Sequence, residues 1–158
     1  MSGQKRGRRI AMTPAEVDAF LAAGRTCRVA TVGPDGRPHV VPLWFAWDGT
    51  ALWLYSITRS RRWADLVRDP RVAVVVDTGA EYAELRGVEI AGTATPVGPV
   101  PRTPAAGHPD TAAAERLFAR KYAGTDAFAA DGRHGWLRVA PDTVLSWDFR
   151  KIPGPELR

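Results

Sequence analysis

Tight-turn signals separate the first long runs of β-forming residues in this chain. The run from Thr26 to Val32 ends at Gly33-Pro34-Asp35-Gly36, and the apolar run from Pro38 to Trp47 ends at Asp48-Gly49. A third run, Ala51 to Ile57, follows with leucines and aromatic residues in alternation. Turns this short join strands that run in opposite directions, because a parallel connection needs about a dozen residues or more. The spacing therefore predicts three consecutive antiparallel strands.

Helices are predicted only at intervals between these strands. Thr13, Pro14 and Glu16 have the spacing of a capping box, which predicts a helix over 14–23. Ser60 is placed to cap a second, short helix. We expect the remaining elements to be two strands, a helix and a final hairpin around Pro141-Asp142, over Arg71 to Asp77, Leu85 to Val97, 111–122, Trp136 to Ala140 and Thr143 to Phe149.

This order of elements disfavours a doubly wound parallel sheet, in which helices alternate with strands one for one. Consecutive short strands favour an antiparallel sheet, and closing it into a barrel would protect the edge strands. The sequence predicts a mainly β protein, a closed or partly closed β-barrel with flanking helices. We expect one domain over 13–151, a basic disordered arm over 1–12 and a flexible tail over 152–158.

Composition narrows the class of protein further. No apolar run approaches the roughly 20 residues that span a bilayer, and no apolar region suited to a secretory signal follows the basic start. Cys27 is the only cysteine, which rules out an internal disulfide and makes the reducing cytoplasm the expected compartment. The 3 histidines are scattered without ligand spacing, so we expect no metal site.

The net charge of +5 invites a nucleic-acid-binding interpretation, but its distribution argues against one. Lys5, Arg6, Arg8 and Arg9 account for most of the excess of 22 basic over 17 acidic residues. The rest of the chain is close to neutral. We therefore expect the arm to be a solvated tail and nucleic acid not to be a partner.

The candidate functional site is the stretch Thr58-Arg59-Ser60-Arg61-Arg62, which follows a predicted strand and opens a predicted helix. A helix N-terminus offers free backbone N–H groups and the positive end of the helix dipole. Ser60 adds a hydroxyl and the arginines add charge in a geometry that suits phosphate. The alternative is a solvated cationic surface, but arginines at a helix start oppose the dipole unless an anion is bound there. The pattern favours a phosphate site.

No catalytic constellation is evident in the sequence. It lacks a Gly-x-Ser-x-Gly elbow, a phosphate-binding Walker loop and a complete dinucleotide fingerprint. Cys27 lies in a predicted core strand and is expected to be inert, and His39 is expected to be an ordinary surface or core histidine. Trp44, Phe45 and Trp53 favour core packing, although one such ring beside a phosphate site would give a planar cofactor an apolar wall.

With these features together, the chain resembles the pyridoxamine 5′-phosphate oxidase-like, FMN-binding split-barrel superfamily, and within it the actinobacterial F-420-dependent reductases. The resemblance covers about Thr13 to Lys151. It is carried by Arg28 to Pro38, Leu43-Trp44-Phe45, Ser60-Arg61-Arg62, Leu66 to Val72, Leu85 to Val88 with Gly92, and Ser146 to Lys151.

The resemblance implies a homodimer with the cofactor in a groove between subunits. It implies that Val40, Val41, Pro42, Leu43 and Trp44 line the ring system of the cofactor. It further implies that the phosphate is held by Thr58, Arg59, Ser60, Arg61 and Arg62, while the partner chain contributes Trp147, Arg150 and Lys151. One position departs from the pattern, because the family usually has lysine where this chain has Arg62.

Coenzyme F-420, a deazaflavin, is the first choice of cofactor, with FMN as the alternative. F-420 carries a phosphodiester and an anionic glutamyl tail, which suit a longer cationic track. A reduced deazaflavin delivers hydride itself, in keeping with the lack of catalytic signatures. We expect an oxidoreductase that reduces an unsaturated small-molecule substrate. An FMN-dependent oxidase or reductase, or a non-catalytic flavin or haem carrier, are the alternatives.

Overall fold

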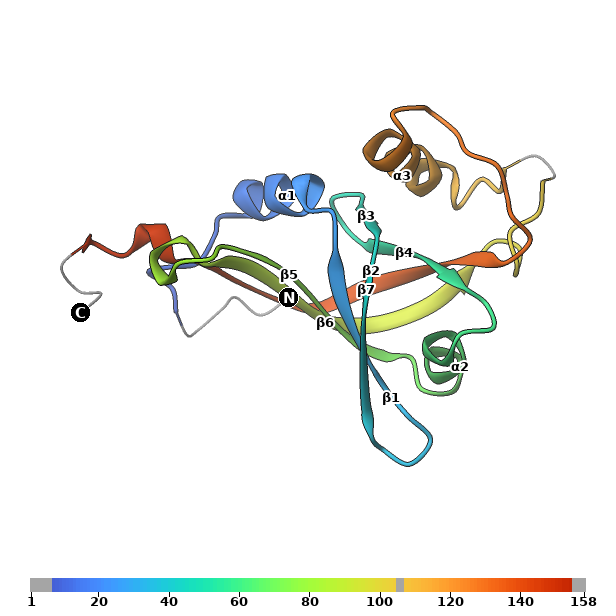
Figure 1. Ribbon diagram of the computed structural model, residues 1–158, viewed down its shortest axis with the longest axis horizontal. Coiled ribbons are helices and arrows are strands. Elements are labelled where there is room, and N and C mark those ends of the chain that lie inside the picture. Colours follow the sequence, from blue (N-terminus) through green and yellow to red (C-terminus); the bar gives the residue numbers. More distant parts are fainter. Residues whose placement is uncertain (1–6, 105–106, 155–158) are drawn as a thin grey trace.

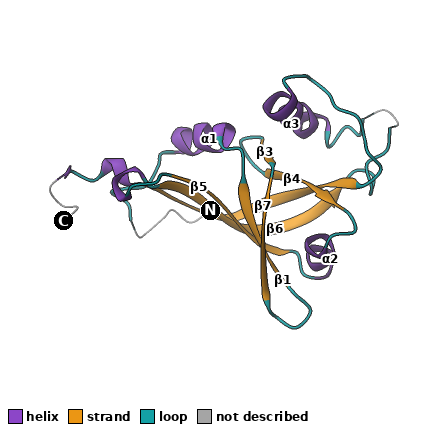
Figure 2. Ribbon diagram, viewed as in Figure 1, coloured by secondary structure: helices purple, strands orange, loops and turns teal. Residues whose placement is uncertain are grey.

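The computed structural model describes residues 7–104 and 107–154. Its seven strands form one antiparallel sheet in the order β2-β1-β5-β6-β7-β4-β3, with the helices at its periphery (Figures 1 and 2). The strands are β1 (Cys27–Val32), β2 (Pro38–Leu43), β3 (Phe45–Trp47), β4 (Leu52–Ile57), β5 (Arg71–Thr78), β6 (Arg86–Val97) and β7 (His134–Asp148). The helices are α1 (Pro14–Ala23), α2 (Arg61–Arg68) and α3 (Ala112–Ala123), with short 3-10 turns η1 (Tyr82–Glu84) and η2 (Phe149–Lys151). The mainly β, antiparallel fold is the predicted one.

Helix α1 begins as its sequence predicts. The Glu16 N–H donates to Thr13 Oγ1 at 3.3 Å, and Glu16 Oε2 accepts the Thr13 N–H at 2.6 Å, which completes the capping box. The chain before it is ordered further back than predicted, because Asp148 N donates to Ile10 O at 2.7 Å and Met12 N to Ser146 Oγ at 3.0 Å. Residues 10 and 12, which belong to the arm expected over 1–12, therefore bond to β7. Residues 1–6 of that arm and residues 155–158 of the expected tail lie outside the described residues.

The segment predicted as one strand from Pro38 to Trp47 is two strands that break at Trp44. The first, β2, pairs with β1 at one edge of the sheet, and the second, β3, pairs with β4 at the opposite edge. The chain thus passes from one edge of the sheet to the other across a single residue. This is the closure that turns the sheet into a half-barrel, and a local β-pattern does not reveal it.

The predicted C-terminal hairpin around Pro141-Asp142 is also wrong. Strand β7 runs without a reversal and pairs with β6 along its length. The irregularity appears instead as a register shift between Ala91 and Gly92, so that Gly92 faces Pro141. Proline has no backbone N–H to donate to the neighbouring strand. Here a bulge, not a turn, accommodates it.

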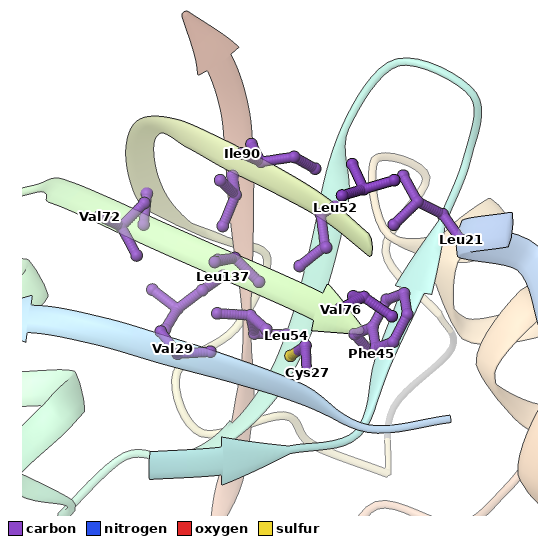
Figure 3. Close-up of a cluster of buried hydrophobic side chains, with 14 of the residues drawn as sticks. Leu21, Cys27, Val29, Phe45, Leu52, Leu54, Val72, Val76, Ile90 and Leu137 are labelled. Carbon is purple, nitrogen blue, oxygen red and sulfur yellow. The ribbon is translucent and has the colours of Figure 1, made fainter. Parts of the chain in front are cut away.

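Two apolar clusters lie on the two faces of the sheet. The inner cluster joins buried residues of six strands to helices α1 and α2, and Leu43 of β2 packs against it. Its side chains point toward one another in Figure 3, including Leu21, Cys27, Val29, Phe45, Leu52, Leu54, Val72, Val76, Ile90 and Leu137. The second cluster lies beneath α3 and contains Ala46, Trp53, Ala114, Phe118 and Trp136. The alternation along β4 therefore separates leucines from aromatic residues as the sequence predicts.

Candidate functional site: the corner between β4 and α2

The predicted phosphate corner begins where β4 ends and α2 starts. Ser60 is the N-cap of α2, and its hydroxyl accepts the Trp63 N–H at 3.2 Å. The next backbone donor, Ala64 N, bonds to Ser60 O at 3.1 Å. The backbone N–H groups of Arg61 and Arg62 have no acceptor among the described residues. They are free donors at the positive end of the helix dipole, as an anion site requires.

Arg62 points inward rather than into solvent. The residue is only 7% exposed, and its Nε and Nη2 donate to the Ser56 hydroxyl at 3.2 and 2.9 Å. Within the described part of the chain, no carboxylate forms an ion pair with it. Burial lowers the pKa of the Arg62 guanidinium, because removing a charge from water disfavours the protonated form. A buried cation without a counter-ion is rare in proteins.

Arg61 differs from Arg62 in having a carboxylate beside it. Its Nε lies 3.8 Å from Oδ2 of Asp65, a residue that is only 1% exposed. The same carboxylate accepts hydrogen bonds from Thr31 Oγ1 at 3.0 Å and from Arg68 Nη2 at 3.2 Å. His39 Nδ1 lies 4.0 Å from Asp65 Oδ2 and has no hydrogen-bond partner in the described structure. Asp65 therefore offsets part of the charge of Arg61 and Arg68.

Thr58 and Arg59 lie beside a pocket that sequence reasoning did not assign. Thr58 N and Oγ1 both donate to Arg133 O, at 2.9 and 3.2 Å. Thr58, Arg59 and Arg133 line a pocket of about 570 Å³. Neither the Arg59 guanidinium nor the Arg133 guanidinium has a hydrogen-bond partner among the described side chains. Arg133 lies in a loop without a recognisable motif, and only the pairing of β4 with β7 brings it to this corner.

The predicted ring-lining segment forms an exposed apolar strip. Val40 is 63% and Trp44 is 52% exposed, and Pro42 between them is also exposed, whereas Val41 and Leu43 are partly buried. The Trp44 ring stacks on Tyr122 of α3 at 4.3 Å between centroids and 4° between planes. Strand β2 lies against β4, which leads into the corner. His39 of β2 lies beside Asp65 of α2, whereas Val40 and Pro42 alternate with His39 and so lie on the opposite face of the strand.

The three C-terminal candidates are not at this corner. The Trp147 ring covers Gly87, where an added Cβ would lie 2.1 Å from it. Arg150 Nε and Nη2 form a bidentate pair with Asp148 at 2.9 and 2.6 Å, and Lys151 Nζ lies 2.6 Å from Glu16 Oε2. Figure 1 places η2 and α2 far apart along the long axis of the molecule. One subunit alone does not bring these residues to the corner.

Cys27 has no nucleophilic character in this setting. The side chain is fully buried, and burial raises the pKa of its thiol to about 12. A thiolate is the reactive form of cysteine, so this residue is a small apolar core group near neutral pH. Within the described residues no three His, Cys, Asp or Glu side chains are grouped to hold a metal ion, and no helix is long and apolar enough to cross a membrane.

Comparison with known proteins agrees with the fold. Residues 13–148 match the pyridoxamine 5′-phosphate oxidase family model. The chain belongs to this family, whose split barrel is a flavin-binding fold. No curated protein matches the sequence.

Several solved structures are also similar to this chain over most of its length. A conserved hypothetical protein from Mycobacterium tuberculosis is 29% identical with a TM-score of 0.77, covering 95% of this chain and 94% of its own. An F-420 reductase is 26% identical with a TM-score of 0.60, covering 80% of this chain and 94% of its own. A FAD-binding protein from Mesorhizobium loti, 21% identical with a TM-score of 0.63 over 86% of this chain and 94% of its own, shares the fold.

Proposed function

We propose that this protein is an oxidoreductase that binds coenzyme F-420 and uses its reduced form to reduce an unsaturated small molecule. The single observation that carries the proposal is the buried side chain of Arg62, the second residue of α2, which has no carboxylate partner in the described part of the chain. A bound phosphate would supply the missing negative charge. The free N–H groups of Arg61 and Arg62 would supply hydrogen bonds to it.

The rest of the corner suits a ligand longer than a single phosphate. Arg59 and Arg133 line the adjoining pocket, and neither guanidinium is paired with a side chain over 7–104 and 107–154, which favours an anionic tail of the kind that F-420 has and FMN lacks. The similarity to an F-420 reductase supports the same choice. The exposed strip of Val40, Pro42 and Trp44 offers an apolar surface for a planar ring system.

In this proposal the cofactor and the protein have separate roles. When bound, the reduced deazaflavin supplies the hydride. The residues of this chain bind and orient it, with cations at the phosphate end and apolar side chains at the ring end. We further propose a homodimer, in which Trp147, Arg150 and Lys151 reach the cofactor of the partner subunit, and a cytoplasmic location.

The cofactor and the role of Arg62 are tested together by fluorescence and absorbance titrations with F-420, FMN and haem. We expect F-420 to bind most tightly. Arg62→Met should weaken its binding about 10- to 100-fold, because a charge-assisted hydrogen bond contributes roughly 1.5–3 kcal/mol. Arg62→Lys should keep most of the affinity, because lysine retains the charge.

Two outcomes would contradict the proposal. Preferential binding of FMN or haem would replace F-420 as the cofactor, and unchanged affinity in Arg62→Met would place the phosphate elsewhere. The thermal melt of each variant shows whether it is folded. Arg71→Met serves as a control, because Arg71 is an exposed arginine already paired with Asp69 at 2.6 Å.

A further inference from the structure

The arginines of the corner are held by partners of different charge. Arg61 and Arg68 lie beside the buried carboxylate of Asp65. Arg62 is held by a hydroxyl, that of Ser56, which cannot neutralise it. An ion pair with a carboxylate would orient an arginine but would also cancel most of its field. A neutral acceptor orients the guanidinium and leaves its full positive charge available to a ligand.

Ser56 is built into the fold for this contact. The residue is completely buried in β4, where it pairs with Gly135 of β7. It lies on the same face of β4 as Leu52 and Leu54, which belong to the apolar core. A hydroxyl at the end of that apolar row has no packing advantage over alanine. The two hydrogen bonds that the hydroxyl accepts, from Nε and Nη2 of Arg62, account for its presence.

We propose that Ser56 is the positioning residue that makes the site selective for a phosphate-bearing cofactor. By accepting two donors from one edge of the guanidinium, it fixes the plane of the Arg62 guanidinium. Without the hydroxyl, the guanidinium keeps its charge but loses its orientation. The inference rests on the proposed function, since it concerns the same anion site.

The test compares each cofactor with its phosphate-free form: FMN with riboflavin, and F-420 with its bare deazaflavin chromophore. In each pair the ring system is the same, and the quantity compared is the dissociation constant of the phosphate-free member divided by that of the phosphate-bearing member. FMN and riboflavin differ only in the phosphate, so their ratio measures phosphate recognition alone. F-420 and its chromophore differ in the whole phosphodiester and glutamyl chain, so their ratio measures recognition of that anionic chain. We expect Ser56→Ala to lower this ratio about tenfold, while the affinity for the phosphate-free member stays unchanged. Loss of a merely structural serine would weaken both members equally.

Two controls separate positioning from stability. Ser146→Ala removes another buried serine, which lies on β7 and whose hydroxyl accepts the Met12 N–H at 3.0 Å. This change should leave the ratio unchanged. In an Arg62→Met background, Ser56→Ala should have no further effect on the ratio, because the group that it orients is gone. Circular dichroism and thermal melts confirm that each variant is folded.

The possible failures are distinguishable. If the unaltered protein shows no preference for either phosphate-bearing member, the proposed function fails and this inference with it. If the preference is present but Ser56→Ala leaves the ratio unchanged, or Ser56→Ala still lowers it in the Arg62→Met background, the phosphate site stands and only the role of Ser56 is overturned.

Discussion

At the scale of single residues, local hydrogen bonds determine how the acidic side chains are charged. Asp131 is the clearest case. Burial by itself would raise the pKa of its carboxyl, but the N–H groups of Arg133 and His134 and the His134 ring outweigh burial and lower this pKa to about 2. His134 Nδ1 lies 2.5 Å from Asp131 Oδ2. The same carboxylate thus orders the loop that carries Arg133.

The pH dependence of folding stability should report this carboxylate. The folded-state pKa of Asp131 lies below the ordinary value of 3.8, so its contribution is present above that pH and is lost as the pH falls toward 2. Urea unfolding of the protein and of Asp131→Asn between pH 6 and 2.5 measures it. We expect the original protein to be more stable at pH 6 and the gap to close in acid. A gap that stays constant with pH would contradict this assignment.

At the scale of elements, two strands depart from what their own residues indicate. The break at Trp44 divides one β-rich segment between opposite edges of the sheet, and Trp44 is held there by its stack on Tyr122. Strand β7 passes through Pro141 because β6 shifts its register at Gly92. Close packing decides both points. A Cβ at Gly92 would lie 2.1 Å from Ala140 O, so only glycine lets the two backbones approach this closely.

Gly92→Ala therefore tests the β6–β7 register. The added methyl group meets backbone atoms that cannot rotate away, so we expect a loss of unfolding free energy of about 1–3 kcal/mol. Thr95→Ala, an exposed position on the same strand, should change it by less than about 0.5 kcal/mol. Urea-induced unfolding followed by tryptophan fluorescence compares the two variants. Equal stabilities would mean that the strands pair differently at this point.

At the scale of the whole molecule, the predicted phosphate contacts lie far from the three predicted C-terminal contacts. Helix α2 lies toward one side of the molecule in Figure 1, and the short turn before the C-terminus, η2, which contains Arg150, lies far from it along the long axis. A complete site that uses both groups needs two subunits. We propose that a two-fold dimer provides this arrangement, with each subunit giving its η2 end to the corner of the other.

Mixing two defective variants tests this shared site. Arg62→Met and Arg150→Met each damage one half of every site, but a mixed dimer contains one site with both arginines intact. After refolding a 1:1 mixture, about a quarter of the sites should bind F-420 with the original affinity, by random pairing of subunits. Light scattering should show a dimer throughout. If no tight sites return although mixed dimers form, Arg150 does not serve the partner's cofactor.

Parts of the candidate site were predictable because they depend on near neighbours in the chain. The cap at Ser60, the start of α2 and the free N–H groups follow from residues 58–63 alone. Sequence also separated the faces of β4. The buried position of the Arg62 side chain was not predictable. It depends on the contact with Ser56, whose place is set by the pairing of β4 with β7. Arg133 was missed for the same reason.

The sequence by itself determined the antiparallel, mainly β class, the capped helices and the basic start of α2, since short turns, caps and alternation are local effects. Only the tertiary structure decided where the barrel closes, which strand runs on through a proline and which arginine is buried without a carboxylate partner among the described residues. These depend on contacts between residues far apart in the chain. Burial and close packing choose among such contacts, and no local pattern records their choice.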